Sequence, residues 1–375
     1  MRIYLFLLLL AAAVTFLVTP AARLVARRAG ALTAVRSRDV HTAVTPRLGG
    51  LAMLAGITAA MLAASQVPFL SALFQDSAQP WAILAAAALV CLLGAADDKW
   101  DLDWFIKLGG QVLAAVILAA EGVRLVSLPI GGITLLSPRS AILLTVLVVV
   151  VSMNAVNFVD GLDGLAAGVM AIGGGAFFLY AYMLTRTAST TDYSSLAALI
   201  TAIMVGACIG FLPHNLHRAR IFMGDSGSML LGLLLAASTI TVTGQIDPGR
   251  LSGADALGQF LPILLPIGVM FIPFLDFALA VVRRIGSGKS PFHADKRHLH
   301  HRLLAIGHSH ARAVAIMYVW TIVVALGLLL PAFLSTRMTL AFWAVGLLGA
   351  VLVTLDPVAR LRRRAPEQKE PDALS

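Results

Sequence analysis

The sequence predicts an all-α protein that crosses a membrane many times, as a bundle of about eleven transmembrane helices. Its 375 residues are 59% hydrophobic and only 13% charged, whereas a soluble domain usually carries about 25% charged residues. The apolar residues also gather into blocks long enough to span a bilayer, which takes roughly 20 residues. The two cysteines, Cys91 and Cys208, lie inside such blocks, so we expect buried thiols rather than a disulfide or a metal pair.

The first apolar block continues to Val18, which is long for the apolar part of a cleaved signal peptide. Arginines follow it, so we expect an uncleaved helix. A run of three glycines at residues 173–175 favours close packing between helices in the sixth block. The expected spans lie at about 3–20, 48–66, 81–96, 105–121, 141–157, 165–184, 196–213, 226–243, 259–282, 313–334 and 338–355.

Basic residues predict the orientation of these helices. Lysine and arginine are concentrated in residues 23–47, in residues 283–312 and in the C-terminal tail. This bias places the odd-numbered connections and the C-terminus in the cytoplasm and the N-terminus outside. The net charge of +9 then faces the cytoplasm, where it suits anionic membrane lipids or phosphorylated ligands, and no nucleic-acid partner is expected. Residues 1–356 form one integral-membrane domain in this prediction, and residues 357–375 form a disordered basic tail.

Four polar clusters fall on the cytoplasmic connections, at residues 97–104, 154–164, 214–228 and 283–312. Each has an ordinary explanation by itself: solvated aspartates, an Asp-Gly turn, or a helix cap at Asp225. The connections expected outside carry acidic residues only singly. Because distant segments bring their polar clusters to the same membrane face, the sequence predicts an active site at the cytoplasmic surface.

The residue types in these clusters indicate metal-assisted phosphoryl transfer. Asn154 and Asn157 share one face of a helix end, and amide and carboxylate oxygens are the ligands that Mg²⁺ prefers. The histidine-rich run could hold a metal, but its flanking cations favour phosphate binding. No P-loop sequence is present, so basic residues would have to neutralise a diphosphate. The residues of that run are His298, His300, His301 and Arg302.

These segments resemble, in order and orientation, the polyprenyl-phosphate N-acetylhexosamine-1-phosphate transferases, the MraY/WecA-type superfamily or glycosyltransferase family 4. The resemblance runs from about residue 36 to residue 303. It implies that undecaprenyl phosphate in the inner leaflet of the bacterial cytoplasmic membrane attacks the β-phosphate of a UDP-N-acetylhexosamine. UMP is released, a lipid-linked diphospho-sugar forms, and Mg²⁺ or Mn²⁺ is required. The matching motifs are PRLGG, DDKWDLDWFIKLGGQ, NAVNFVDGLDG, NLHRARIFMGDSGS and DKRHLHHRL.

The resemblance also implies a role for individual residues. Asn157 and Asp225 match the residues that hold the metal, and Asp97 matches the carboxylate that deprotonates the lipid phosphate. Asp98 would support Asp97 or the metal, and Lys107 matches a phosphate-binding lysine. The histidine-rich run matches a loop that closes over the diphosphate and sugar. The remaining substrate-binding candidates lie around the expected uridine site and beside the metal: Asn154, Asp160, Gly161, Leu162, Asp163, Asn215 and Phe222.

The motifs PRLGG and HLHHRL resemble the branch that makes N-acetylglucosamine (GlcNAc) diphospholipids for O-antigen, enterobacterial common antigen or teichoic acid. The peptidoglycan branch, which transfers phospho-MurNAc-pentapeptide, usually has PTMGG instead. One departure is Arg218, which stands where family members usually have proline. Another UDP-N-acetyl sugar therefore stays open. A homodimer is also implied, without an interface in the sequence.

Three other functions fit parts of the pattern. A secondary transporter would carry ionisable residues near mid-span and two related halves, but only Asp276 lies well inside an apolar block and no internal repeat is visible. A membrane scaffold would leave the polar clusters unexplained. A lipid phosphatase would share the acids and cations without needing a nucleotide pocket. We expect a groove near the fourth and ninth spans to admit the lipid, and direct attack rather than an aspartyl intermediate.

Overall fold

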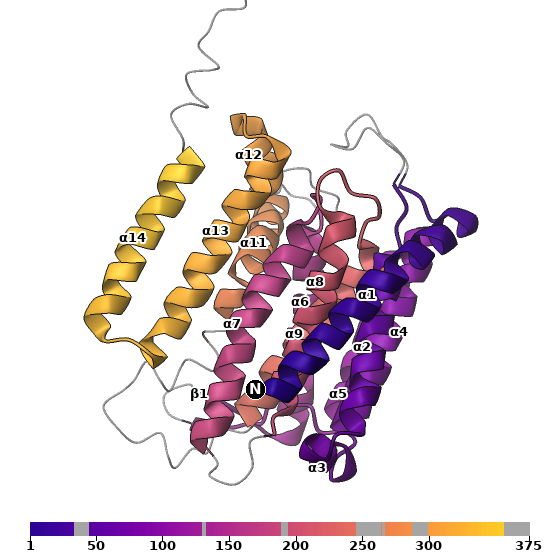
Figure 1. Cartoon of the computed structure of the whole chain (residues 1–375), viewed down its shortest axis with the longest axis vertical. Helices are drawn as coiled ribbons and strands as arrows, with labels where there is room; N and C mark the ends of the chain where they lie inside the picture. The colour runs from indigo at the N-terminus through magenta and orange to yellow at the C-terminus, as the bar shows by residue number, and fades with distance from the viewer. Residues whose placement is uncertain are drawn as a thin grey trace, which may run out of the picture.

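The structure, a computed structural model, describes residues 1–33, 45–129, 133–188, 194–244, 264, 267–286 and 299–355. Long helices stand side by side, and the short helix α12 lies at the end of the bundle opposite the N-terminus (Figure 1). The helices are α1 (Arg2–Ala29), α2 (Gly49–Ser65), α3 (Ser71–Gln75), α4 (Gln79–Trp100), α5 (Trp104–Ala120), α6 (Pro138–Val159), α7 (Leu165–Ala188), α8 (Leu196–Asn215), α9 (Gly224–Gly244), α11 (Phe271–Gly286), α12 (Leu299–Ile306), α13 (His310–Leu329) and α14 (Thr336–Leu355). Short 3₁₀ turns occupy Pro68–Leu70 and Leu330–Ala332, and an antiparallel hairpin pairs β1 (Ser127–Pro129) with β2 (Ile133–Leu135).

The prediction of an all-α, membrane-spanning protein is confirmed. Within the described ranges, eight helices are long and apolar enough to cross a membrane, or nine if the bent pair Gly49–Ser65 and Pro68–Gln75 forms one span. Helix α5 is a shorter apolar helix of 17 residues. The count of eleven and the orientation stay predictions, because residues 259–263 and 265–266 of the ninth expected span lie outside the described residues, as does the tail.

Two expected boundaries were wrong. Helix α1 continues past residue 20 to Ala29, where basic side chains in its last turn interact favourably with the helix dipole, and Gly30 ends it with a φ of 72°. Helix α4 continues to Trp100, so Asp97 and Asp98 lie on its last turn rather than in a loop. Both aspartates are therefore held by regular helical geometry.

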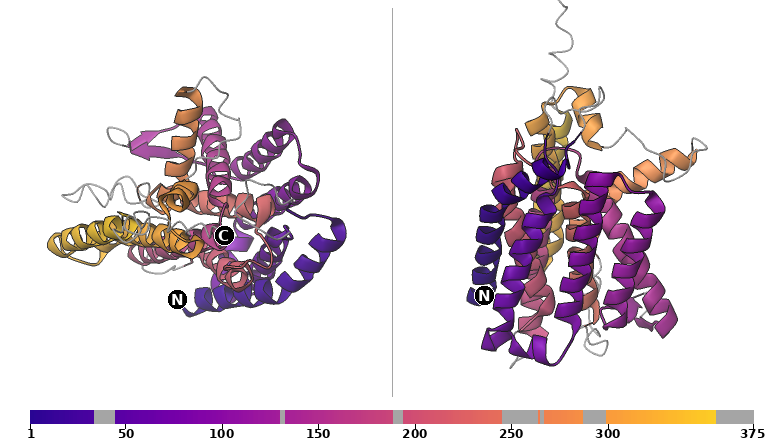
Figure 2. Two further views of the ribbon diagram at one scale, coloured as in Figure 1. Left: turned by 90° about the horizontal axis from the view of Figure 1, so that it is seen from above. Right: turned by 90° about the vertical axis from the view of Figure 1, so that its right-hand side faces the viewer.

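The core lies around α8 and α9, whose most apolar windows are 83% and 89% buried inside the protein. Helix α14, by contrast, is only 11% buried by this measure and lies beside α13 at the edge of the bundle (Figure 2). Close packing was expected at residues 173–175. It occurs at Gly173 and Gly174, where an added Cβ would meet Val269 and Met204, but Gly175 faces open space.

Segment 46–50, which contains PRLGG, lies against the beginning of α9. The backbone N–H groups of Gly49 and Gly50 donate to the carbonyl oxygens of Phe222 at 3.0 Å and Met223 at 3.1 Å. A Cβ on Gly50 would overlap the backbone at Gly227, and one on Gly94 of α4 would overlap the backbone of Asp225 and Ser226. Glycine lets both segments approach closely, so the start of α9 is held between α2 and α4.

This packing predicts that Gly94→Ala destabilises the protein. The added methyl group has no space against the first turn of α9, and overpacking of this kind costs about 1–3 kcal/mol. The midpoint of thermal unfolding in detergent should therefore fall. Gly109→Ala on α5 is the matched control, because an added Cβ there meets nothing within 4 Å. Equal midpoints for the two variants would contradict the packing.

Candidate active site

An ion-paired lysine joins three helices at the end of the bundle where the predicted clusters meet. Lys107, in the first turn of α5, donates from Nζ to Asp97 Oδ2 of α4 at 2.9 Å and also to Asp225 Oδ2 of α9. An unpaired ammonium at the edge of a membrane would be costly, and two carboxylates pair with this one. The three side chains are 12–22% exposed, which leaves them accessible to a ligand.

Asp98 does not face this lysine, although it is adjacent to Asp97. Its fully buried carboxylate accepts the N–H groups of Asp225 at 3.1 Å and Ser226 at 3.2 Å, and Arg47 lies 3.8 Å from Oδ1. The first N–H groups of a helix have no partner within that helix, and the helix dipole favours a negative charge there. Asp98 therefore caps α9 from another helix and fixes the backbone at Asp225.

Helix α6 contributes two amides to the same region. Asn157 lies beside Asp225 and donates from Nδ2 to Ser228 Oγ of α9 at 2.9 Å. Asn154, one turn earlier, donates to Gln111 Oε1 of α5 at 2.8 Å. The two asparagines thus connect α6 to α5 and α9, two of the three helices that Lys107 joins.

These residues fit a divalent cation by donor chemistry. Asp97, Asp225 and Asn157 supply carboxylate and amide oxygens, which are the ligands that Mg²⁺ prefers. Lys107 already forms ion pairs with both carboxylates, and an ammonium in this position competes with a bound cation for the same oxygens. Metal binding would therefore shift Lys107 away from at least one aspartate, toward an incoming anion.

Asp160, at the end of α6, is a further acid in this neighbourhood. Burial, together with the negative charges of Asp225 and Asp98, raises the pKa of its carboxyl group to about 7. The charge of Arg47 and a hydrogen bond from the backbone of Gly224 act in the opposite direction. Asp160 thus lies within the electrostatic range of the ion pair, at the point where the chain turns from α6 into α7.

The turn between α6 and α7 forms a second part of the site. Gly164, with a φ of 76° that glycine adopts easily, donates its N–H to Asn215 Oδ1 at 3.0 Å. Asn215 in turn donates to the carbonyl of Ile221 at 2.9 Å. The turn and Asn215, both expected near uridine, are therefore in direct contact. Gly161 lies on the same turn, and Phe222 follows Ile221, with its N–H bonded to Pro46 at 2.8 Å.

The other predicted residues have different surroundings. Leu162 is buried in an apolar cluster that includes Leu303 and Ile316, so its side chain packs in the core. Arg302 is exposed on α12. His300 and His301 lie on α12, where only their backbone is described, and His298 lies outside the described residues.

Asp276, the acid that favoured a transporter, has a structural contact instead. Its buried carboxylate accepts the N–H of Leu299 at 2.8 Å, at the start of α12. This contact accounts for an acid inside an apolar block without ion transport.

Sequence reasoning missed several residues in contact with the site. Arg47 was part of a recognised motif, but its spacing gave no sign that it approaches Asp98. His217 and His310 both contact Asp163, and His310 belongs to none of the matched motifs. Such contacts between distant segments depend on the tertiary fold.

Comparison with known proteins identifies the family. The model of glycosyl transferase family 4 matches residues 80–243. A decaprenyl-phosphate N-acetylglucosaminephosphotransferase of Mycobacterium tuberculosis is 45% identical, over 97% of this chain and 90% of the relative. A probable undecaprenyl-phosphate N-acetylglucosaminyl 1-phosphate transferase of Bacillus subtilis is 32% identical, over 80% and 77%. A phospho-N-acetylmuramoyl-pentapeptide-transferase of Desulforudis audaxviator is 31% identical, over 84% and 85%.

The similarity to the mycobacterial relative covers nearly the whole of both chains, and the first four of the matching motifs contact one another in the structure. The chain therefore belongs to glycosyltransferase family 4, the polyprenyl-phosphate N-acetylhexosamine-1-phosphate transferases, and is a multi-pass protein of the bacterial membrane.

Proposed function

We propose that this protein transfers GlcNAc 1-phosphate from UDP-GlcNAc to a polyprenyl phosphate and releases UMP. The supporting observation is the contact of Lys107 with Asp97 and Asp225, a cation between two acids beside the amide of Asn157. In this arrangement a metal ion could replace the Lys107 ammonium at the two carboxylates, and the ammonium could then bind a phosphate. GlcNAc is favoured over phospho-MurNAc-pentapeptide because the relatives named for GlcNAc include the one at 45% identity.

In this proposal the lipid carrier is a polyprenyl phosphate, and the relatives differ in the length of its prenyl chain. The motifs suggested undecaprenyl phosphate, whereas the relative at 45% identity is named for decaprenyl phosphate and the one at 32% for undecaprenyl phosphate. The higher identity favours decaprenyl phosphate. Parallel assays with both carriers decide between them.

In the proposed reaction, an oxygen of the lipid phosphate attacks the β-phosphorus of UDP-GlcNAc. A bond forms between that oxygen and phosphorus, and the bond from phosphorus to the bridging oxygen breaks, so UMP leaves with the electron pair. Asp97 takes the proton of the lipid phosphate, and Lys107 turns toward the phosphate that it neutralises. Asp225 and Asn157 would hold Mg²⁺ or Mn²⁺, which neutralises the diphosphate. Transfer of this kind depends mainly on positioning and charge stabilisation.

Release of UMP tests the proposed reaction directly. Purified protein given UDP-GlcNAc, Mg²⁺ and a polyprenyl phosphate should release UMP, and omission of lipid or addition of a chelator should stop release. Asp225→Ala should lower the rate about 100-fold or more, as expected when one group that stabilises charge is removed. Release of UMP without lipid would indicate hydrolysis, and no release from any UDP-N-acetyl sugar would refute the proposal.

The two adjacent aspartates should respond differently to the same change. Asp98→Asn should lower the unfolding midpoint, because an amide cannot accept both N–H groups at the start of α9 and an unsatisfied buried group costs about 1–3 kcal/mol. Asp97→Asn should stay folded, since its oxygen can still accept the N–H of Leu102, but should lose most activity. Matching thermal and kinetic losses in both variants would refute this division.

Lys107 should affect metal affinity as well as rate. Lys107→Gln removes the ammonium that competes for Asp97 and Asp225, so half-maximal activity should need less Mg²⁺. The maximal rate should nevertheless fall by about 10²-fold, because a charge on the phosphate site is lost. Mg²⁺ titration of the UMP assay measures both quantities. Lys99→Gln, an exposed lysine over the Trp100 ring, is the control and should leave both unchanged.

A further inference from the structure

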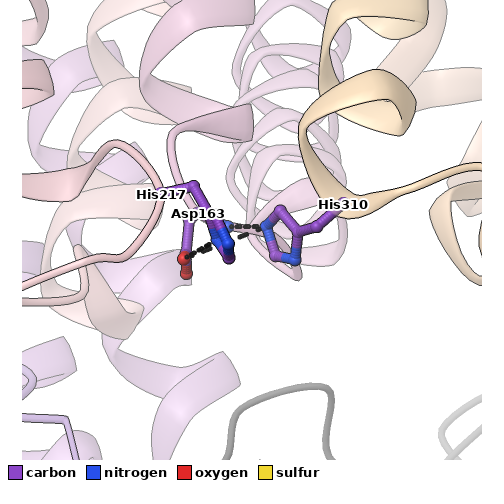
Figure 3. A group of neighbouring side chains, drawn as sticks. All are labelled: Asp163, His217 and His310. Atoms are coloured by element: carbon purple, nitrogen blue, oxygen red, sulfur yellow. Dashed lines mark hydrogen bonds and ion pairs between the residues drawn. The ribbon is translucent and has the colours of Figure 1, made fainter.

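Two histidines from distant segments hold Asp163, a residue on the turn between α6 and α7. His217 belongs to the connection between α8 and α9, and His310 is the first residue of α13 (Figure 3). One ligand atom from each of the three residues lies within 4.8 Å of the others. The imidazole rings stack on each other, with centroids 4.7 Å apart and an interplanar angle of 27°. We call these three residues the histidine clamp.

The hydrogen bonds of the clamp are divided between the backbone and the side chain of Asp163. The backbone N–H of Asp163 donates to His310 Nε2 at 3.0 Å. His217 Nδ1 donates to Asp163 Oδ2 at 3.0 Å, and the N–H of Ala219 donates to the same oxygen at 3.2 Å. His310 thus fixes the course of the backbone, while His217 fixes the direction of the carboxylate.

This pattern argues against a metal centre formed by the same residues. A histidine binds metal through the lone pair of a ring nitrogen, and the lone pair of His310 Nε2 already accepts a hydrogen bond from Asp163. Parallel rings in a stack also direct their nitrogens poorly toward one common point. The observed geometry is that of a hydrogen-bonded support.

Helix α13 supports the same turn through a second side chain. Tyr318 donates its hydroxyl hydrogen to the carbonyl oxygen of Gly164, next to Asp163. A Cβ on Gly168 of α7 would overlap the Tyr318 ring, so α7 and α13 are in close contact here. The turn is therefore held by His310 and Tyr318 of α13 and by Asn215 and His217.

We propose that His310 and His217 are positioning residues that hold Asp163 for binding of the nucleotide of the donor. This inference rests on the proposed function, in which the turn around Asp163 and Asn215 binds uridine. It also assigns a part in donor binding to α13, which lies beyond residues 80–243 that the family model matches. Because an ordered turn has less freedom to lose on binding, removal of the clamp should weaken nucleotide binding rather than the chemical step.

The test uses the purified full chain and variants that separate the two ring nitrogens. A glutamine side chain places its amide about where Nε2 lies, and an asparagine places it about where Nδ1 lies. His310→Leu and His217→Leu should each raise the KM for UDP-GlcNAc about tenfold, the effect of losing one hydrogen bond. His310→Gln and His217→Asn should bring the KM for UDP-GlcNAc most of the way back to the wild-type value, whereas His310→Asn and His217→Gln should leave it raised. The kcat and the KM for the lipid should change less than twofold.

Direct binding of UDP-GlcNAc, followed by calorimetry, separates this inference from the proposed reaction. If the leucine variants lose affinity and the matched amides recover it, the clamp is supported even in a preparation that releases no UMP. Unchanged affinity in His310→Leu, or a loss that falls on kcat or on the lipid, overturns it. His214→Ala is the control, because His214 bonds to the carbonyl of Phe16 on α1. Zn²⁺ added alone to the wild type, if it binds stoichiometrically and His310→Leu abolishes binding, would make the cluster a metal site and also overturn the clamp.

Discussion

The ion pairs of Lys107 are the interaction on which the site depends. Two carboxylates, from α4 and α9, come together at the end of an apolar bundle, where their mutual repulsion would otherwise separate the helices. A single ammonium offsets this repulsion, and it does so from a flexible side chain that can move. The same contact therefore stabilises the helix arrangement and, in the proposed reaction, prepares a place for a cation and a phosphate.

The packing around the start of α9 holds Asp225, one of the acids that pair with Lys107, in place. Asp98 caps the first turn of α9, and Gly50 and Gly94 let α2 and α4 approach its backbone without intervening side chains. Asp225 is held as a consequence, because its backbone N–H is one of the capped groups. Asp98, which the sequence analysis grouped with the catalytic residues, thus positions Asp225. The neighbouring Asp97 faces Lys107 instead.

The sequence was sufficient for the fold class because the length and the hydropathy of the spans are averaged over many residues. It was also sufficient to bring Asp97, Lys107, Asn157 and Asp225 together, since their motifs occur on connections of the same predicted face. It could not distinguish the role of Asp97 from that of Asp98, because Asp98 caps α9 from another helix and such a cap depends on tertiary contacts. His310 was missed for the same reason: nothing in its local sequence indicates that it accepts a hydrogen bond from Asp163.

The end of α6 connects the two parts of the site. Asn157 lies on its last turn beside Asp225, and Asp160 and Asp163 follow within the turn that leads into α7. The metal-binding and nucleotide-binding candidates therefore follow one another along a short segment, but different contacts hold them. Asn157 is bonded to Ser228 of α9, whereas the turn is bonded to α13 and to the α8–α9 connection. An ordered turn has less freedom to lose when the donor binds, so its rigidity favours donor binding, while Asn157 keeps its place beside Asp225. The contacts that α13 and the α8–α9 connection make with Asp163 and Gly164 supply that rigidity.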